Sequence, residues 1–460
     1  MKLTLAQLVI EIIFGDGQTD NLENEMQRRS SRTSGFSPTR VNDMSFSPHE
    51  VYARCLLGDH GYPLWTPQLN TELRETYQLE GLKIGDVGVV SPIDSSFDVL
   101  LNITLPRSEQ PYPKLVRENF TPIVLDHELD LASQPDAVAA HGVVPSASVQ
   151  LTSKDIDNHD QTPSRADYEF SLSSENGAVL VLPEGAQSCD LRNENKFLDV
   201  AIKHGVDWYE CATKEAGRLI HDNSLYLITG FHKTRSWSLG AVGRSGSSLQ
   251  NRRCVKFKVG EIHQGGVTAR AYFWVATHGF TGRVGPMYPY EDSNRIPRIR
   301  PGNQTVFIRG FRITVNKLLF MKTVSVKTRQ GTFFGLKTHL AKLVSHRKSE
   351  SASSENTTDN AVDQDFSLSH NRLHTDAHIT IDRVPDVSQT IHPGDMINQY
   401  MLKEEPSAVV AVTHDSLWIK MLQTGLLKLE DFADVNSLGE VLSKYYDVIL
   451  QDNGVYLQKS

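Results

Sequence analysis

The sequence has few cysteines and no long apolar run, which argues against several common classes of protein. Its four cysteines, Cys55, Cys189, Cys211 and Cys254, lie far apart and form no CxxC pair. This spacing fits neither a disulfide framework nor a zinc knuckle, and it predicts a reducing, cytoplasmic setting. No apolar run reaches the roughly 20 residues of a membrane-spanning helix, and Glu11 interrupts the apolar start MKLTLAQLVIEIIF. We therefore expect neither a transmembrane span nor a signal peptide.

Acidic residues are scarce in one part of the chain. Residues 230–348 contain 22 Lys and Arg but only three Asp and Glu, in a chain whose net charge is −8. Such a basic block can serve an acidic protein, an anionic membrane surface or a phosphate backbone, or the acidic remainder of the chain can neutralise it. The sequence has no RNP motif, zinc finger or heptad-bearing basic region, so we do not expect nucleic acid as the partner.

Composition divides the chain into six parts. We expect a disordered or helical tail at 1–45, a small β-rich domain at 46–105, and an acidic, loop-like connector at 106–168. A basic α+β sheet domain at 169–344, a flexible linker at 345–376 and a small α/β domain at 377–460 follow. The predicted fold class is α+β, with a central, mostly antiparallel sheet region, helices, and the small C-terminal α/β unit.

Local patterns give several elements of this fold. In CVKFKVG, residues 254–260, apolar positions alternate with Lys256 and Lys258, which predicts a strand with one buried and one cationic face. Two helices are expected around 197–202 and 208–216. The C-terminal unit is expected to contain a strand at 378–382, a helix from Pro393, a strand at 407–415, two more helices, and a strand pair around Asp452.

The basic block supplies the candidate binding site. A sheet that buries one face places many cations on the other, near a core. The planar guanidinium of Arg donates two parallel hydrogen bonds to a phosphate or carboxylate. The predicted site for an anionic partner comprises Arg252, Arg253, Lys256, Lys258, Arg295, Arg298, Arg300, Arg309 and Arg312. The alternative interpretation is a charged sheet face that is only solvated.

Few residues suggest catalysis. In GRSGSS, residues 243–248, Ser247 replaces the second glycine of a nucleophile elbow, so a hairpin loop is the simpler interpretation. His414 and Asp415 end a strand where α/β units bind ligands and could transfer protons. Asp415 or Ser416 also fits as the cap of a helix that starts at Leu417. The other histidines lack metal-ligand spacing, and we expect neither a metal nor a cofactor.

A resemblance adds to these observations. The runs GDHGYPLWTPQLN, LKIGDVGVVSP, FDVLLNI, AVLVLPEGA, SLYLITGFHKTRSW and SAVVAVTHDSLW resemble those of a large family of fungal proteins that has no established activity. This resemblance therefore assigns no site residue. The strand SLYLITGF also resembles a strand of gasdermin-like pore-forming proteins, which pair a basic, sheet-rich region with acidic lipids.

Three functional hypotheses follow. The first is a non-enzymatic interaction module whose basic central domain binds an acidic partner, in fungal defence or self-recognition. The second is a gasdermin-like protein that binds membranes or forms pores, for which residues 179–326 would form one long, bent antiparallel sheet. The third is a hydrolase of unknown substrate that uses His414 with Asp415, or Ser245.

Overall fold

The computed structural model describes residues 46–68, 70–159, 162–218, 220, 223–243, 254–264, 267–276, 279–286, 302–317, 319 and 392–460. Contacts divide the chain into two units, Met1–Ser45 and Phe46–Ser460, and all described residues belong to the second. The tail expected at 1–45, the linker expected at 345–376 and the strand expected at 378–382 lie outside the described residues.

The described helices differ from the sequence predictions at two places: α3 and α4 lie in the segment 46–105, which was expected to be β-rich, and a single helix replaces the two expected between 197 and 216. Their bounds are α3 Pro48–Leu56, α4 Glu75–Glu80, α5 Asn195–Glu210, α8 Pro393–Glu404, α9 Asp415–Gln423 and α10 Val435–Leu442. Short helical turns lie at Arg107–Glu109, Pro113–Leu115 and Leu429–Ala433. The prediction of two helices between 197 and 216 was wrong, because α5 is one helix that continues into a π-helical turn, Cys211–Glu215.

The described strands form three sheets. The base sheet has ten strands in the order β17-β18-β16-β15-β10-β2-β3, with β1 paired to β15 and with β9 and then β4 paired beside β10. The middle sheet has the order β14-β11-β8-β5, and the outer sheet the order β13-β12-β7-β6. The strand bounds are β1 Tyr62–Pro63, β2 Asp86–Val90, β3 Phe97–Asn102, β4 Leu131–Val138, β5 Gly142–Pro145, β6 Val149–His159, β7 Thr162–Leu172, β8 Gly177–Leu182, β9 Ala186–Leu191, β10 Ser224–Thr234, β11 Trp237–Val242, β12 Cys254–Gln264, β13 Val267–Ala276, β14 Phe280–Gly285, β15 Gln304–Val315, β16 Val410–His414, β17 Tyr446–Gln451 and β18 Gly454–Lys459.

The fold class is α+β, as the sequence predicted. Among the described strand pairs, β16 with β18 is the only parallel one. The C-terminal unit has the expected helix, strand, helix, helix and strand pair, and the strand pair turns at Asp452, whose φ is +52°. This unit has its own core, in which Ile397, Trp418 and Val455 are fully buried.

The prediction of a loop-like connector at 106–168 was wrong. This segment contains β4, β5, β6 and the first part of β7. Apolar alternation fails to mark β4 because its central residues are exposed, and the strand exists through its antiparallel pairing with β9. Pairing with a distant strand leaves no local signal in an exposed edge strand.

The expected domains also share one sheet. β2 and β3 from the segment 46–105 continue the base sheet through β10, and β16 from the C-terminal unit pairs with β15. The structure therefore joins segments 46–105, 169–344 and 377–460 by strand pairing within the unit Phe46–Ser460.

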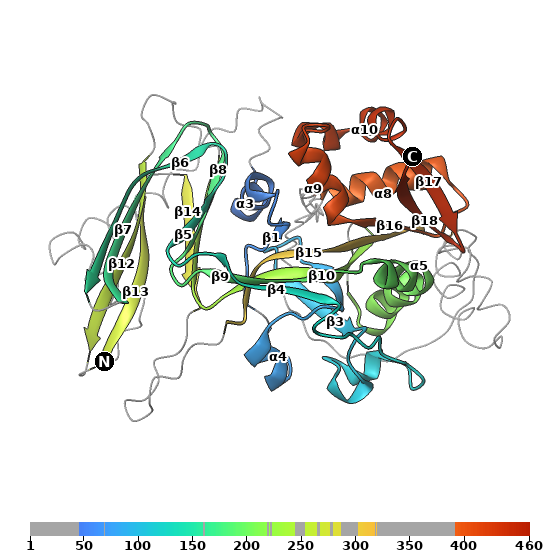
Figure 1. The fold of residues 1–460 in the computed structure, drawn as a ribbon, viewed down its shortest axis with the longest axis horizontal. Helices are drawn as coiled ribbons and strands as arrows, with labels where there is room; N and C mark the ends of the chain where they lie inside the picture. Colours follow the sequence, from blue (N-terminus) through green and yellow to red (C-terminus); the bar gives the residue numbers. More distant parts are fainter. Residues whose placement is uncertain are drawn as a thin grey trace, which may run out of the picture. The chain divides into compact units, whose positions relative to one another are not determined.

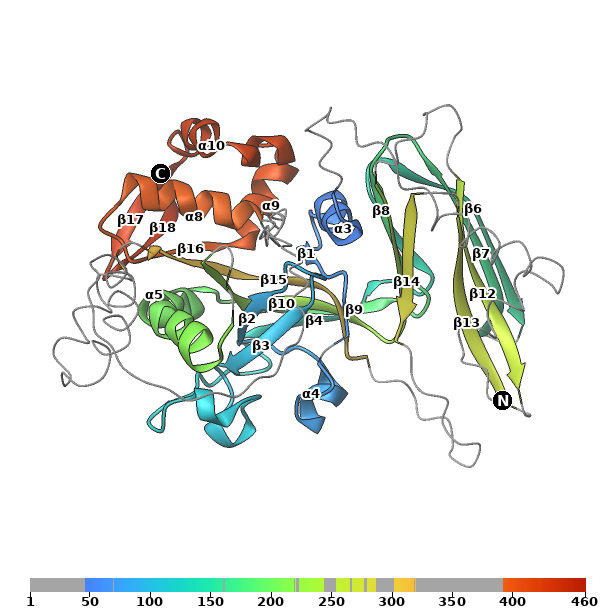
Figure 2. The same cartoon turned by 180° about the vertical axis from the view of Figure 1, so that it is seen from behind.

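Figures 1 and 2 show α5 against the base sheet, α3 beside the middle sheet, and the outer sheet on the other side of the middle sheet. α5 packs Phe197 and Ala201 against the base sheet, and α3 packs Tyr52 against the middle sheet. The outer sheet packs its apolar face on the middle sheet through a fourth core that includes Phe170 and Phe257.

Candidate functional site

The main feature of the central region is a four-stranded ribbon that passes through all three sheets. In the base sheet its strand order is β4-β9-β10-β15, in the middle sheet β5-β8-β11-β14, and in the outer sheet β6-β7-β12-β13. Every pairing between these neighbours is antiparallel. The order is the same at each level because β4, β5 and β6 follow one another along the chain, as do the other three sets of strands.

The ribbon therefore consists of two long hairpins that lie side by side. We call residues 131–191 the first hairpin and residues 224–315 the second hairpin. The first hairpin turns between β6 and β7, and the second turns between β12 and β13. Figures 1 and 2 show both hairpin ends together in the outer sheet, on the far side of the middle sheet from α3.

Special backbone conformations mark the corners at which the ribbon bends. His141, between β4 and β5, has a φ of +60°, and Gly185, between β8 and β9, has a φ of +71°. A Cβ atom at Gly185 would lie 2.6 Å from the backbone oxygen of Val138 on the neighbouring strand. Only glycine fits this close approach at a positive φ. At the corner between β13 and β14, Gly279 has a φ of +86°.

The outer sheet has two different faces. Its inner face carries Tyr168 and Phe170 on β7 and Val255, Phe257 and Val259 on β12, all at most 4% exposed. This face packs on buried valines of β8 and β11 in the middle sheet. The alternation predicted for CVKFKVG is thus confirmed.

The outer face of this sheet is polar along its centre and apolar at one edge. Lys256 lies opposite Glu169 on β7, with 3.4 Å between Nζ and Oε2, and Lys258 lies opposite Asp167, with 3.5 Å between Nζ and Oδ2. At the edge, on β13, Phe273 is 37% exposed and Val275, which lies opposite Lys256, is 48% exposed.

The structure describes four of the nine cations in the predicted site, and all four face carboxylates. Besides Lys256 and Lys258, Arg309 donates to both carboxylate oxygens of Asp190, over 2.7 and 2.6 Å. The buried Arg312 donates to both oxygens of Asp395, over 2.7 and 2.8 Å. The expectation of a coherent electropositive face is not met at these positions, because each charge has a local counter-ion.

The five remaining arginines of the predicted site lie outside the described residues. They are Arg252, Arg253, Arg295, Arg298 and Arg300. The motif GRSGSS also lies there beyond Gly243, and with it Ser245, the serine of the hydrolase hypothesis.

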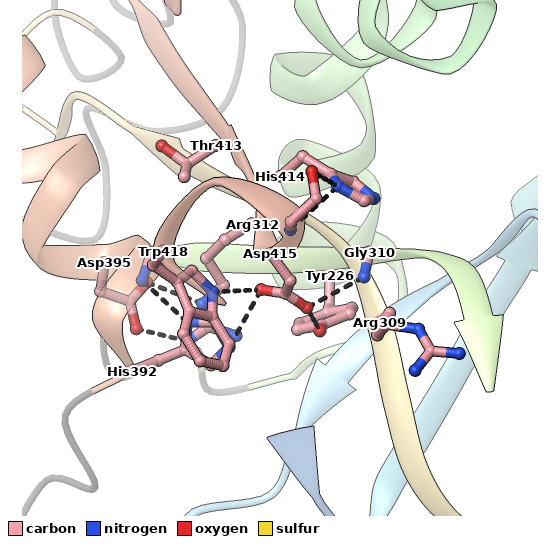
Figure 3. A network of polar contacts seen from close by, with 12 residues as sticks. Tyr226, Arg309, Gly310, Arg312, His392, Asp395, Thr413, His414, Asp415 and Trp418 are labelled. Atoms are coloured by element: carbon pink, nitrogen blue, oxygen red, sulfur yellow. Dashed lines mark hydrogen bonds and ion pairs between the residues drawn. The ribbon is translucent and has the colours of Figure 1, made fainter. Parts of the chain in front are cut away.

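A second feature is a buried polar network where the C-terminal unit joins the base sheet (Figure 3). Asp415 is fully buried and accepts hydrogen bonds from Trp418 Nε1 over 2.8 Å, from the Gly310 amide over 3.0 Å, and from the Tyr226 hydroxyl. Burial raises the pKa of Asp415 to about 6, and these hydrogen bonds oppose the rise. The network attaches α9 to β10 and β15.

His392 lies beside Asp415 in the same network. Its Nδ1 accepts the Gly394 amide and caps α8, while its Nε2 lies 3.5 Å from Asp415 Oδ1, beyond a good hydrogen bond. Burial, followed by the charge of Arg312, lowers the pKa of His392 to about 3, so the ring is neutral. The contact with Asp415 is therefore not an ion pair.

His414 and Asp415 point to different partners. His414, not Asp415 or Ser416, caps α9, because its ring accepts the Ser416 amide over 3.1 Å. Its Nε2 lies 2.7 Å from the Thr229 hydroxyl. Burial lowers the pKa of His414 to about 3, and neither His414 nor Asp415 lines either of the two large cavities of about 620 and 780 Å³. The geometry gives this pair a structural role.

Sequence reasoning missed the carboxylates that pair with the arginines. Asp190 is 119 residues from Arg309, and Asp395 is 83 residues from Arg312. The sequence signal for Asp395 was its place in the first turn of the helix that begins at Pro393, which fits a capping role equally well.

Across the described residues, no group of three or more His, Cys, Asp or Glu side chains could hold a metal ion. None of the helices in this part of the chain is both long and apolar enough to cross a membrane.

Comparison with protein-family models and with curated proteins finds no match to this chain.

Proposed function

We propose that this protein acts on membranes, by straightening the two hairpins at their outer ends and inserting β6–β7 and β12–β13 into lipid. The observation that carries the proposal is the constant strand order of the ribbon through three sheets. Because each strand of the ribbon has the same neighbours in all three sheets, the bends between the sheets can straighten without any strand changing its pairing partner. The resemblance of residues 224–231 to a strand of gasdermin-like pore-forming proteins agrees with this function.

The dimensions of the outer strands suit a bilayer. β6, β7 and β12 contain 11 residues each, and β13 contains 10. A tilted strand crosses the hydrocarbon core with about 9–11 residues. The outer sheet therefore has the length that insertion requires.

The two faces of the outer sheet suit the same task. Apolar residues such as Phe257 now pack on the middle sheet and would exchange that core for lipid, so their surface stays out of water. The Lys256–Glu169 and Lys258–Asp167 pairs lie on the opposite face and would remain on an aqueous side. Lipid-facing and water-facing residues alternate in membrane strands in this way.

Unpaired strand edges add a requirement. β6 and β13 are the edge strands of the outer sheet among the described strands. Because backbone groups in lipid need hydrogen-bond partners, inserted edges must pair with edges of neighbouring copies. The proposal therefore predicts insertion as an assembly.

The acidic-partner hypothesis loses support at the four described cations, each of which faces a carboxylate. The remaining excess of Lys and Arg between residues 230 and 348 can instead draw the protein to anionic lipid, and salt would screen this attraction.

The test is a reversible lock across the corner between β13 and β14. A Cβ atom at Gly282 would lie 2.7 Å from Cγ of Trp274. One more carbon–carbon bond of about 1.5 Å leads to Cβ of residue 274, so the Cβ atoms of a Trp274→Cys, Gly282→Cys variant lie within about 4.2 Å. This distance permits a disulfide. In one straight strand these residues would be about 26 Å apart.

The assay is release of dye from vesicles. We expect the wild-type protein to release dye from anionic but not from neutral vesicles, and to lose this activity at high salt. The oxidised double variant should release no dye above background until a reductant is added. The single Trp274→Cys variant has lost the same indole without gaining a lock, and should not respond to the reductant. Equal release by the oxidised and reduced double variant refutes straightening, and no release by the wild-type protein refutes the membrane function.

A further inference from the structure

A cavity of about 780 Å³ lies between the base of the ribbon and the loops that cover it. Its walls come from β9, β10, the start of β4, and the segments 80–84, 104–106 and 122–127. Most of the lining is apolar and includes Leu82, Ile84, Leu105, Ile123, Leu125 and Phe231. Small-molecule sites are concave, mostly apolar and about 300–1,000 Å³ in volume, so this cavity has the size and character of one.

One charged side chain in this lining is buried. Lys233 is 6% exposed, and its Nζ donates to the backbone oxygen of Glu80 over 2.6 Å and lies 4.0 Å from the centre of the Phe231 ring. Lys233 forms no ion pair with any carboxylate among the described residues. The nearby Glu80 carboxylate is paired with Lys83, with 2.8 Å between Nζ and Oε2.

The buried carboxylate of Asp86, whose charge acts on Lys233, already has partners of its own. Asp86 accepts hydrogen bonds from the Tyr77 hydroxyl, the Asn102 amide group and the Lys83 amide, over 2.6–2.8 Å. Burial lowers the pKa of Lys233 to about 8, although the charge of Asp86 acts in the opposite direction. An anion brought into the cavity would therefore stabilise a buried cation that lacks a direct counter-ion.

We propose that this cavity binds an amphiphile with one carboxylate and an unbranched hydrocarbon chain, whose carboxylate pairs with Lys233 and whose chain lies along the apolar walls. A single buried cation matches a single negative charge, whereas a polyphosphate brings several. The apolar walls reward a chain over a polar body, because each buried methylene leaves water. This site does not rest on the proposed membrane function, since it lies at the base sheet and needs no movement of the hairpins.

The test compares two ligands that differ only in the head group. Decanoate and decan-1-ol are titrated into the full-length protein at pH 7 by calorimetry. We expect the wild-type protein to bind decanoate at least about tenfold more tightly than decan-1-ol, and Lys233→Met to abolish this difference while it still binds the alcohol. Lys403→Met removes a lysine on α8 that lies outside the cavity lining, and should leave the tenfold difference intact.

A cavity-filling variant keeps the proposal falsifiable if Lys233→Met does not fold. Leu125→Trp places an indole among the apolar walls at a half-buried position and should weaken both ligands by at least about tenfold. The proposal is overturned by any of three results: no binding of decanoate to the wild-type protein, equal affinity for the two ligands, or unchanged decanoate binding in Lys233→Met or in Leu125→Trp.

Discussion

Removal of one partner from the buried Arg312–Asp395 ion pair should lower the free energy needed to open the C-terminal unit away from β15. The two side chains are 8% and 7% exposed and share two parallel hydrogen bonds, which join β15 to the first turn of α8. In Arg312→Met the Asp395 carboxylate stays buried without its counter-ion. Removing one partner of such a pair costs about 3–5 kcal/mol, which corresponds to a factor of roughly 160 to 5,000 in an equilibrium constant.

Hydrogen exchange of the α8 and β16 amides is the assay, because it measures opening of this unit without requiring the whole chain to unfold in one step. We expect exchange in Arg312→Met to be faster by about two to four orders of magnitude. Arg309→Met is the matched control on the same strand: its partner Asp190 is 38% exposed, so water can solvate the abandoned carboxylate. This control should change exchange less than about tenfold.

A double variant separates the charge from the packing. Arg312→Met with Asp395→Leu removes both charges, and should be more stable than Arg312→Met alone because no buried ion remains uncompensated. The reasoning fails if Arg312→Met exchanges like the wild-type protein, or if the double variant is no more protected than the single one.

Three further outcomes follow from the structure. Gly185→Ala should lower the free energy of unfolding in urea by about 2–3 kcal/mol, because Gly185 has a positive φ and a Cβ atom there would meet the backbone of β4. Gly217 also has a positive φ but has open space around it, so Gly217→Ala should cost about 1 kcal/mol. Equal costs for the two variants would contradict the corner geometry. The double variant Lys256→Ala, Lys258→Ala should change the free energy of unfolding by less than about 1 kcal/mol and should still bind vesicles, because both lysines are partly exposed and paired with carboxylates. Loss of vesicle binding would show that these two lysines contact the lipid. Burial lowers the pKa of Lys233 from 10.5 to about 8, so between these pH values the unfolded chain holds a proton that the folded chain lacks, and stability rises with pH. From pH 8 to 10.5 the wild-type protein should therefore gain about 3 kcal/mol relative to Lys233→Met, and parallel stability curves would contradict the burial of this ammonium.

The sequence predicted elements whose own residues specify them. Alternation in residues 254–260 identifies β12 and its two faces, because one face enters a core and the other meets water. Pro393 at the first turn of α8 and the turn at Asp452 identify the C-terminal elements in the same local way.

The sequence could not predict features that depend on distant partners. β4 is a strand because β9 is beside it, and its exposed side chains leave no pattern. The count of basic residues said nothing about Asp190 or Asp395, which neutralise Arg309 and Arg312 only after folding. A count of basic residues in the sequence therefore overestimates the positive charge available to a partner wherever folding places carboxylates beside those residues.

The ribbon itself depends on the same long-range order. Its corners at His141 and Gly185 show in the sequence only as a histidine and a glycine in turns. That the two hairpins keep the same neighbours at three levels follows from the register of strands far apart in the chain. The most informative feature for function was thus hidden from local patterns.

The central claim is that the outer sheet inserts into lipid with its inner face toward the hydrocarbon. Its most direct test attaches an environment-sensitive fluorophore to one of two adjacent residues of β13, in two separate variants. Tyr272 lies on the inner face, against Phe257, and Phe273 lies on the exposed outer face. With anionic vesicles that carry a lipid-chain quencher, a label at position 272 should brighten, shift to the blue and be quenched, while a label at position 273 should remain in water. If both labels keep their solution spectra, or both enter lipid alike, the outer sheet does not insert as an amphipathic pair of hairpins.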